Sequence, residues 1–147
     1  MTSRLVNGVH HLFTRVYYED TDAAGIVYYA NYLKFAERAR TELLRLLGVE
    51  QERLRRETGI AFAVKRCTVD YFRPALLDDE LLVESRLVAV GGASVDVDQR
   101  VSRGAAELAR LAVRIACLGR DGRPARLPPA LRAALMELMP KVERNAT

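Results

Sequence analysis

The chain has few of the features that mark specialised classes of protein. Only two of its 147 residues are cysteines, Cys67 and Cys117, and neither belongs to a CxxC pair. A disulfide is therefore not indicated, and both thiols are expected to behave as small buried hydrophobes. No apolar run approaches the roughly 20 residues that cross a bilayer, and residues 1–8 lack the apolar core of a signal peptide. The expected compartment is the reducing cytoplasm.

Runs of like charge are also absent. The net charge is +4, from 23 basic and 19 acidic residues that are scattered along the sequence. A nucleic-acid partner is not indicated, whereas a small phosphate-bearing molecule would suit this mild balance. The length fits one compact domain over residues 1–147, with no room for a second of normal size.

Hydrophobic spacing predicts one long helix near the start of the chain. Residues 9–18 have strand character, residues 19–30 form an acidic turn, and residues 31–47 place apolar side chains at the helical spacing of 3.6 residues. Asn31 is expected to cap the start of this helix and Gly48 to end it.

Four more strands are predicted, at residues 60–72, 80–90, 93–103 and 106–118, with short helices at 50–56 and 130–138. Short connections favour an antiparallel sheet, whose apolar face would cover the long helix. The predicted fold class is therefore α+β, with a five-stranded antiparallel sheet wrapped around one long central helix. A homodimer would protect the sheet edges.

The most informative segment is the turn before the helix, where Asp20 and Asp22 lie among small residues that include Gly25. Acids just before a helix lie near free backbone N–H groups and the positive end of the helix dipole. An oxyanion can be stabilised there, and an ionised carboxylate can act as a nucleophile or base. Such acids are also common turn formers, so spacing alone leaves the role of Asp22 open. Asp20 is expected to be structural.

The same segment resembles a known family. The run DTDAAGIVYYANY at residues 20–32, followed by FAERARTE at 35–42, is similar to the 4-hydroxybenzoyl-CoA thioesterase family. The similarity is strongest to the Tol-Pal-associated acyl-CoA thioesterases of Gram-negative bacteria. It continues through VDYFRPA at 69–75, LDDE at 77–80 and RPARLP at 123–128.

This resemblance implies the hotdog fold and hydrolysis of an acyl-CoA thioester without a metal or redox cofactor. It also implies homodimers, often paired into tetramers, whose active sites lie between protomers. The catalytic carboxylate would be Asp22, and a backbone N–H at or near Tyr29 would polarise the thioester carbonyl. The Tol-Pal-associated relatives often carry His at that position, so Tyr29 keeps the backbone donor and loses the imidazole. Gly25 is expected to permit a tight backbone geometry, and Gly25 and Tyr28 are both candidates for the substrate-binding part of the turn.

The groups that hold the coenzyme A phosphates are less clearly marked. Some relatives have a basic cluster after the third strand, where this chain has two glycines followed by Ser94. Ser94 is a candidate for binding phosphate or water, and the basic candidates are Lys65, Arg66 and Arg100.

Three alternatives stay open at this point. A helix carboxylate, Glu37, is the catalytic acid in the first. In the second, the protein is a hotdog dehydratase that uses His10 or His11. The third is a non-catalytic acyl-thioester or envelope-machinery binding protein with the same fold. Four tyrosines would line the acyl slot or pack in the core: Tyr17, Tyr18, Tyr28 and Tyr32.

Overall fold

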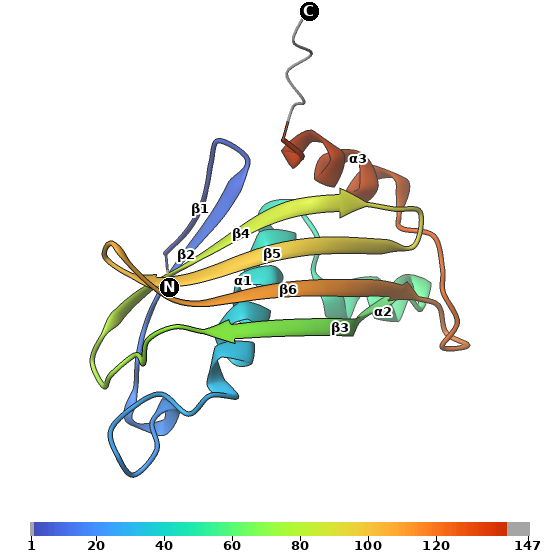
Figure 1. Cartoon of the computed structure of the whole chain (residues 1–147). Coiled ribbons are helices and arrows are strands. Elements are labelled where there is room, and N and C mark those ends of the chain that lie inside the picture. The colour runs from blue at the N-terminus through green and yellow to red at the C-terminus, as the bar shows by residue number, and fades with distance from the viewer. Residues whose placement is uncertain (1, 141–147) are drawn as a thin grey trace, which may run out of the picture.

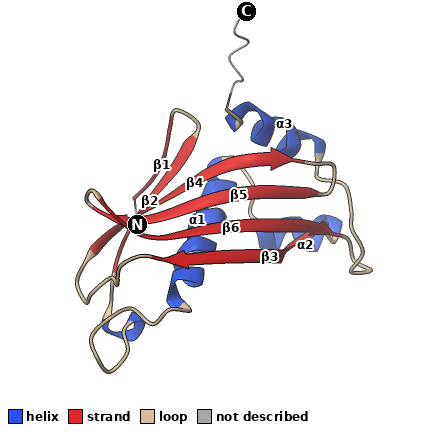
Figure 2. Ribbon diagram, in the orientation of Figure 1, coloured by secondary structure: helices blue, strands red, loops and turns tan. Residues whose placement is uncertain are grey.

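A curved antiparallel sheet packs one face against a long helix in the computed structural model, which describes residues 2–140 (Figures 1 and 2). The sheet has six strands in the order β1-β2-β4-β5-β6-β3. Their bounds are β1 (Thr2–Val6), β2 (Val9–Arg15), β3 (Ala61–Tyr71), β4 (Glu80–Val90), β5 (Ser94–Arg103) and β6 (Ala106–Leu118). The helices are η1 (Tyr18–Asp20), α1 (Asn31–Leu46), α2 (Gln51–Thr58) and α3 (Pro129–Leu138). The predicted α+β class is confirmed.

The N-terminus departs from the prediction, because the sheet has six strands rather than five. β1 pairs with β2 around Asn7 and Gly8, which both have positive φ. An Asn-Gly pair with positive φ is the signature of a tight hairpin, so the sequence did contain a signal for this strand. The first predicted strand also ends early, at Arg15, because Tyr18–Asp20 form a 3₁₀ turn.

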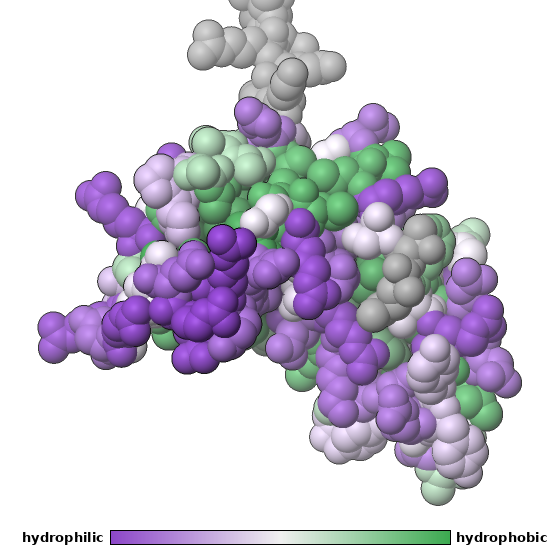
Figure 3. Space-filling model, turned by 180° about the vertical axis from the view of Figure 1, so that it is seen from behind, coloured by the Kyte–Doolittle hydropathy of each residue, from purple (hydrophilic) through white to green (hydrophobic). Residues whose placement is uncertain are grey.

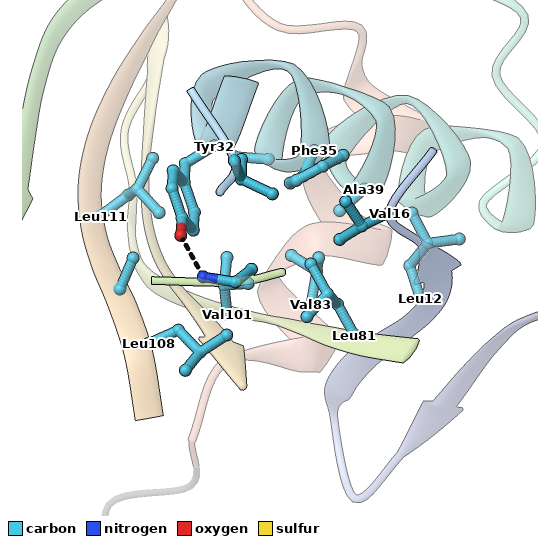
Figure 4. Close-up of a cluster of buried hydrophobic side chains, with 14 of the residues drawn as sticks. Leu12, Val16, Tyr32, Phe35, Ala39, Leu81, Val83, Val101, Leu108 and Leu111 are labelled. Atoms are coloured by element: carbon cyan, nitrogen blue, oxygen red, sulfur yellow. Dashed lines mark hydrogen bonds between the residues drawn. The ribbon is translucent and has the colours of Figure 1, made fainter. Parts of the chain in front are cut away.

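Helix α1 packs its apolar stripe onto the inner face of the sheet. Tyr32, Phe35, Ala36 and Ala39 are almost completely buried there, together with side chains from four strands (Figure 4). Burying a large apolar side chain stabilises the fold by about 2 kcal/mol, which makes α1 the main core element. The helix is followed by Gly48 at φ +85°, as predicted.

The sheet has one apolar and one polar face, as the alternation in β5 predicted. Val95, Val97 and Val101 of β5 are buried, while Asp96 and Asp98 lie on the outer face and are only partly buried.

The two cysteines differ in their exposure. Cys117 is buried as expected, whereas Cys67 is exposed, so the prediction for Cys67 was wrong; both thiols are free.

Strand β3 forms one edge of the sheet and is unusually exposed. All residues from 63 to 68 are exposed, and Val64, Tyr71 and Phe72 are about half exposed. β3 pairs only with β6 among the described strands, so its other edge carries free backbone groups.

Seen from behind, the surface combines hydrophobic areas with a strongly hydrophilic side (Figure 3). None of the helices within residues 2–140 is long and apolar enough to cross a membrane.

Candidate active site

The turn between η1 and α1 is a small closed loop at one end of the sheet (Figure 1). Thr21 and Val27 form a β-bridge at its base, and the Asp22 N–H donates to the Ile26 carbonyl at 2.8 Å. The Gly25 N–H donates to the Asp22 carbonyl at 3.1 Å, and Gly25 has φ +80°. That conformation is strained for residues with a Cβ, so Gly25 is needed for the geometry of the turn.

Asp22 lies exposed in this turn. Its Oδ1 accepts a hydrogen bond from the Ala24 N–H at 2.8 Å, an arrangement that fixes the carboxylate to its own backbone. Within residues 2–140, no hydrogen bond is formed by the second oxygen, Oδ2. The side chain is therefore held by one oxygen and presents the other to an incoming molecule.

Asp20 connects the turn to the helix. Its carboxylate is buried and accepts hydrogen bonds from the Tyr17 N–H at 2.9 Å and from Asn31 Nδ2 at 3.0 Å. Its carbonyl accepts from the Tyr28 N–H at 3.0 Å. Asp20 is thus structural, as expected. The predicted cap was wrong, because Asn31 directs its amide to Asp20 and Ala30 occupies the capping position without a side-chain bond.

The two peptide groups at the start of α1 are held in fixed directions. The Tyr28 carbonyl accepts from the Asn31 N–H, and the Tyr29 carbonyl accepts from the Tyr71 hydroxyl, both at 2.8 Å. Peptides are planar and trans, so fixing each carbonyl also fixes the N–H of the following residue, Tyr29 or Ala30. In the described part of the chain neither N–H has a hydrogen-bond acceptor, and both lie at the positive end of the helix dipole.

Tyrosine rings surround these peptides. The ring centroids are 4.6 Å apart for Tyr28 and Tyr29, 6.4 Å for Tyr29 and Tyr71, and 5.4 Å for Tyr32 and Tyr71. The Tyr29 hydroxyl raises the pKa of Tyr28, and burial raises the pKa of Tyr71. Tyr32 is buried and accepts the Ala75 N–H at 2.9 Å (Figure 4), so its role is packing.

Tyr71 is the residue that sequence reasoning missed. It lies in the quoted VDYFRPA run, but no spacing rule indicates that the end of β3 meets the start of α1. The contact joins residues that are 42 positions apart, so only the folded sheet reveals it.

The proposed phosphate contacts lie elsewhere on the same chain. Ser94 begins β5 and is level with Ala63 of β3 across the sheet. Ala63 precedes Tyr71 by eight residues, about 26 Å along a strand. Lys65 sits at a β-bulge next to Arg66, roughly 17–20 Å from Tyr71 by the same measure. A single chain therefore does not bring these three side chains together with Asp22.

The alternative catalytic groups lie on β2 and α1 rather than in the turn. His10 is completely buried on β2, where burial and then His11 lower its pKa to about 4. His11 lies 3.9 Å from Glu84. Glu37 is exposed on α1, two turns beyond Tyr29. None of these groups contacts the turn at residues 20–30 through a hydrogen bond or ion pair in the described residues.

Known proteins share this architecture and sequence. The family model described as the thioesterase-like superfamily matches residues 16–135. The acyl-CoA thioesterase YbgC of Haemophilus influenzae is 46% identical over 126 residues, which cover 84% of this chain and 92% of that protein.

Solved structures of thioesterases are also similar to this chain. A probable thioesterase from Bartonella henselae has a TM-score of 0.78 at 35% identity, covering 82% of this chain and 99% of that one. A thioesterase from Thermus thermophilus, complexed with coenzyme A and Zn, has a TM-score of 0.75 at 31% identity, covering 89% of this chain and 94% of that one. The expected hotdog fold and thioesterase identity are confirmed, and the chain belongs to the thioesterase-like superfamily.

Proposed function

We propose that the protein hydrolyses acyl-CoA thioesters to free acid and coenzyme A, with Asp22 as the catalytic carboxylate. The observation that supports this most strongly is the oriented carboxylate of Asp22 on a turn that Asp20 ties to the start of α1. The YbgC relative is an acyl-CoA thioesterase by name, and coenzyme A is bound in the Thermus structure. The acyl group is left open.

Asp22 has two chemical routes to the products. As a nucleophile, its Oδ2 bonds to the thioester carbon, the C–S bond breaks, and the thiolate leaves with the electron pair. Water then cleaves the resulting mixed anhydride and regenerates the carboxylate. As a general base, Asp22 instead accepts a proton from a water that attacks the same carbon. Either route needs the carboxylate in its ionised form.

The backbone N–H of Tyr29, with that of Ala30 beside it, is the proposed oxyanion site. Both donors are free in the described structure and held in place by the bonds to the preceding carbonyls. Fixed donors aimed at developing charge are effective because they need no reorganisation, and one such donor typically lowers the barrier by about 3 kcal/mol. Thiols have a pKa near 8.5, so the thiolate is a good leaving group. The absence of an imidazole at position 29 is therefore compatible with turnover.

A second copy of the chain is expected to pair with the exposed edge of β3. That edge offers free backbone groups and half-exposed Val64 and Tyr71, and half-exposed Phe72 follows directly after it. The proposed assembly is a homodimer that pairs again into a dimer of dimers, with one domain per chain, and its proposed compartment is the cytoplasm. In such a dimer, phosphate contacts from Ser94, Lys65 or Arg66 would come from whichever protomer lies closer to the bound coenzyme A.

Release of free thiol from butyryl-, decanoyl- and benzoyl-CoA tests this function. The wild type should release thiol from at least one ester, and Asp22→Asn should reduce kcat by about a thousandfold. Asn keeps an oxygen that can accept the Ala24 N–H, so the turn is preserved. Glu19→Gln, an exposed neighbour, is the matched control and should retain wild-type rates. Binding of these esters without thiol release would instead favour a binding protein.

A further inference from the structure

A cavity of about 220 Å³ opens between α1 and β3, away from the turn that carries Asp22. Its walls are largely apolar and include Leu87, Val97 and Ile115 from the sheet and Leu131 and Leu135 from α3. A dry apolar cavity of about 150 Å³ accommodates a benzene ring. This one can therefore hold several methylene groups or a small ring.

The cavity continues the face of α1 that begins beside Tyr29. Leu33, Glu37 and Leu44 recur on that face at helical spacing; Leu33 is 42% exposed, and the other two line the cavity. Glu37 lies eight residues beyond Tyr29, about 12 Å along the helix axis. An extended chain advances about 1.2 Å per bond, so an acyl chain of roughly ten carbons has the length that separates the proposed oxyanion site from the cavity.

One cation lines this apolar space. The Arg40 side chain is partly buried, and its Nη1 donates to Gln99 Oε1 at 2.7 Å. Gln99 is completely buried and is itself fixed, because its Nε2 donates to the Ala36 carbonyl and to Ser85 Oγ, both at 2.9 Å. The guanidinium is thus anchored at one corner, and its four other N–H donors are free of hydrogen bonds within residues 2–140.

Arg40 also lacks a carboxylate partner at close range. No carboxylate of the described residues lies within 4.0 Å of its guanidinium nitrogens. Burial lowers the pKa of Arg40 and Glu37, one turn away, raises it, and an arginine in a protein stays protonated at neutral pH. A partly desolvated cation without a carboxylate partner is unfavourable, and a further oxygen acceptor on a ligand would relieve that cost.

We infer that this cavity is an acyl-tail subsite and that Arg40 selects acyl-CoA esters of about ten carbons with an oxygen acceptor at the far end. A terminal carboxylate or hydroxyl supplies this acceptor, and a plain alkyl tail leaves the guanidinium unpaired. This inference rests on the proposed function, because it assigns a substrate class to the same active site. The contact is distant from the reacting carbon, so it should act on KM more than on kcat.

The test compares four esters: butyryl-, decanoyl-, 10-hydroxydecanoyl- and mono-decanedioyl-CoA. Wild type should hydrolyse at least one of the oxygen-bearing ten-carbon esters with a kcat/KM about tenfold above decanoyl-CoA, through a lower KM. Preference for the diacid would identify a carboxylate ligand, and preference for the hydroxy acid a neutral one. Equal values for all three ten-carbon esters would overturn the inference even before any variant is made.

Arg40→Met keeps an unbranched side chain and removes the charge. It should abolish the preference over decanoyl-CoA, whereas Arg38→Met, an exposed arginine on the same helix, should keep it. Each preference is taken as a ratio within one enzyme, so a general loss of folded protein cancels. A preference that survives Arg40→Met would overturn the inference.

A second variant covers the case in which Arg40→Met does not fold. Leu131→Phe narrows the cavity from the α3 side and should lower kcat/KM for every ten-carbon ester relative to butyryl-CoA by about tenfold. An unchanged ratio would show that the tail lies elsewhere. Failure of the wild type to release thiol from any of the four esters would count against the proposed function itself, and so the two failures are distinguishable.

Discussion

The start of α1 and its middle use the same construction for different tasks. At the start, buried Asp20 anchors the turn that carries Asp22. In the middle, buried Gln99 anchors Arg40 beside an apolar cavity. In the proposed mechanism, the first region leaves backbone donors free for a charge that forms during the reaction. In the proposed tail subsite, the second region presents a cation to a ligand group that is already polar. Changes at the start should therefore act on kcat, and changes in the middle on KM.

The largest effect on stability is expected from removing the anchor at the start. Asp20→Ala deletes two hydrogen bonds to a buried carboxylate and leaves the Asn31 amide unpaired. The free energy of unfolding should fall by about 4 kcal/mol, measured by urea denaturation, and thiol release should slow as the turn loosens. Glu19→Ala is the exposed control. A loss below about 1 kcal/mol would mean that Asp20 does not hold the turn.

The buried polar row beneath the middle of α1 should produce a pH dependence. His10 lies opposite Ser85, which lies opposite Gln99 in the sheet. Burial lowers the pKa of His10 from 6.5 to about 4, with His11 adding to this effect and Glu42 opposing it. The unfolded chain therefore binds a proton below pH 6.5 that the folded chain binds only below pH 4.

Above pH 6.5 the protonation of His10 should therefore not lower the free energy of unfolding. As the pH falls from 6.5 to 4, the free energy of unfolding should decrease, because only the unfolded chain binds this proton. The full loss amounts to at most about 3 kcal/mol. The measurement is the difference in unfolding free energy between wild type and His10→Gln, taken at several pH values across this window. A difference that stays constant over this range would contradict the assignment.

A smaller effect on kcat is expected from removing the hydrogen bond that supports the Tyr29 peptide. Tyr71→Phe removes the hydroxyl that donates to the Tyr29 carbonyl but keeps the ring. A hydrogen bond of about 1 kcal/mol predicts a fall in kcat of roughly fivefold with little change in KM. Tyr18→Phe, at an exposed tyrosine in the preceding turn, serves as the control. A change in KM alone would place Tyr71 in substrate binding rather than in positioning the peptide.

The smallest effect is expected at Tyr29 itself. If the backbone N–H is the catalytic donor, Tyr29→Phe should change kcat by less than about twofold, because the peptide is unaltered. The side chain is 62% exposed, so stability should also change little. A tenfold fall in kcat would give the hydroxyl a role of its own.

Much of the fold was predictable because its signals are local. The helical spacing in residues 31–47 and the alternation in residues 93–103 correspond closely to α1 and β5. The N-terminal hairpin was missed although Asn7 and Gly8 form a recognisable turn signal. The capping role of Asn31 was also mispredicted, because a buried carboxylate eleven residues earlier competes for its amide.

The site was predictable only in part. Asp22, Gly25 and Tyr29 share one short segment, so their sequence pattern marks them together. Tyr71 and Arg40 depend on contacts across 42 and 59 positions, which no spacing rule supplies. The cavity likewise forms from three helices and four strands. Candidate residues that share one segment can thus be predicted from sequence, whereas the cavity and the long-range contacts around them require the folded chain.

The central claim is that the Asp22 carboxylate carries out the chemistry beside the start of α1. Single-turnover thiol release with excess enzyme tests it most directly, since product release then has no influence on the rate. The account predicts that Asp22→Asn slows this step about a thousandfold while the dissociation constant of the ester changes only a few-fold. A single-turnover rate within tenfold of wild type would contradict it.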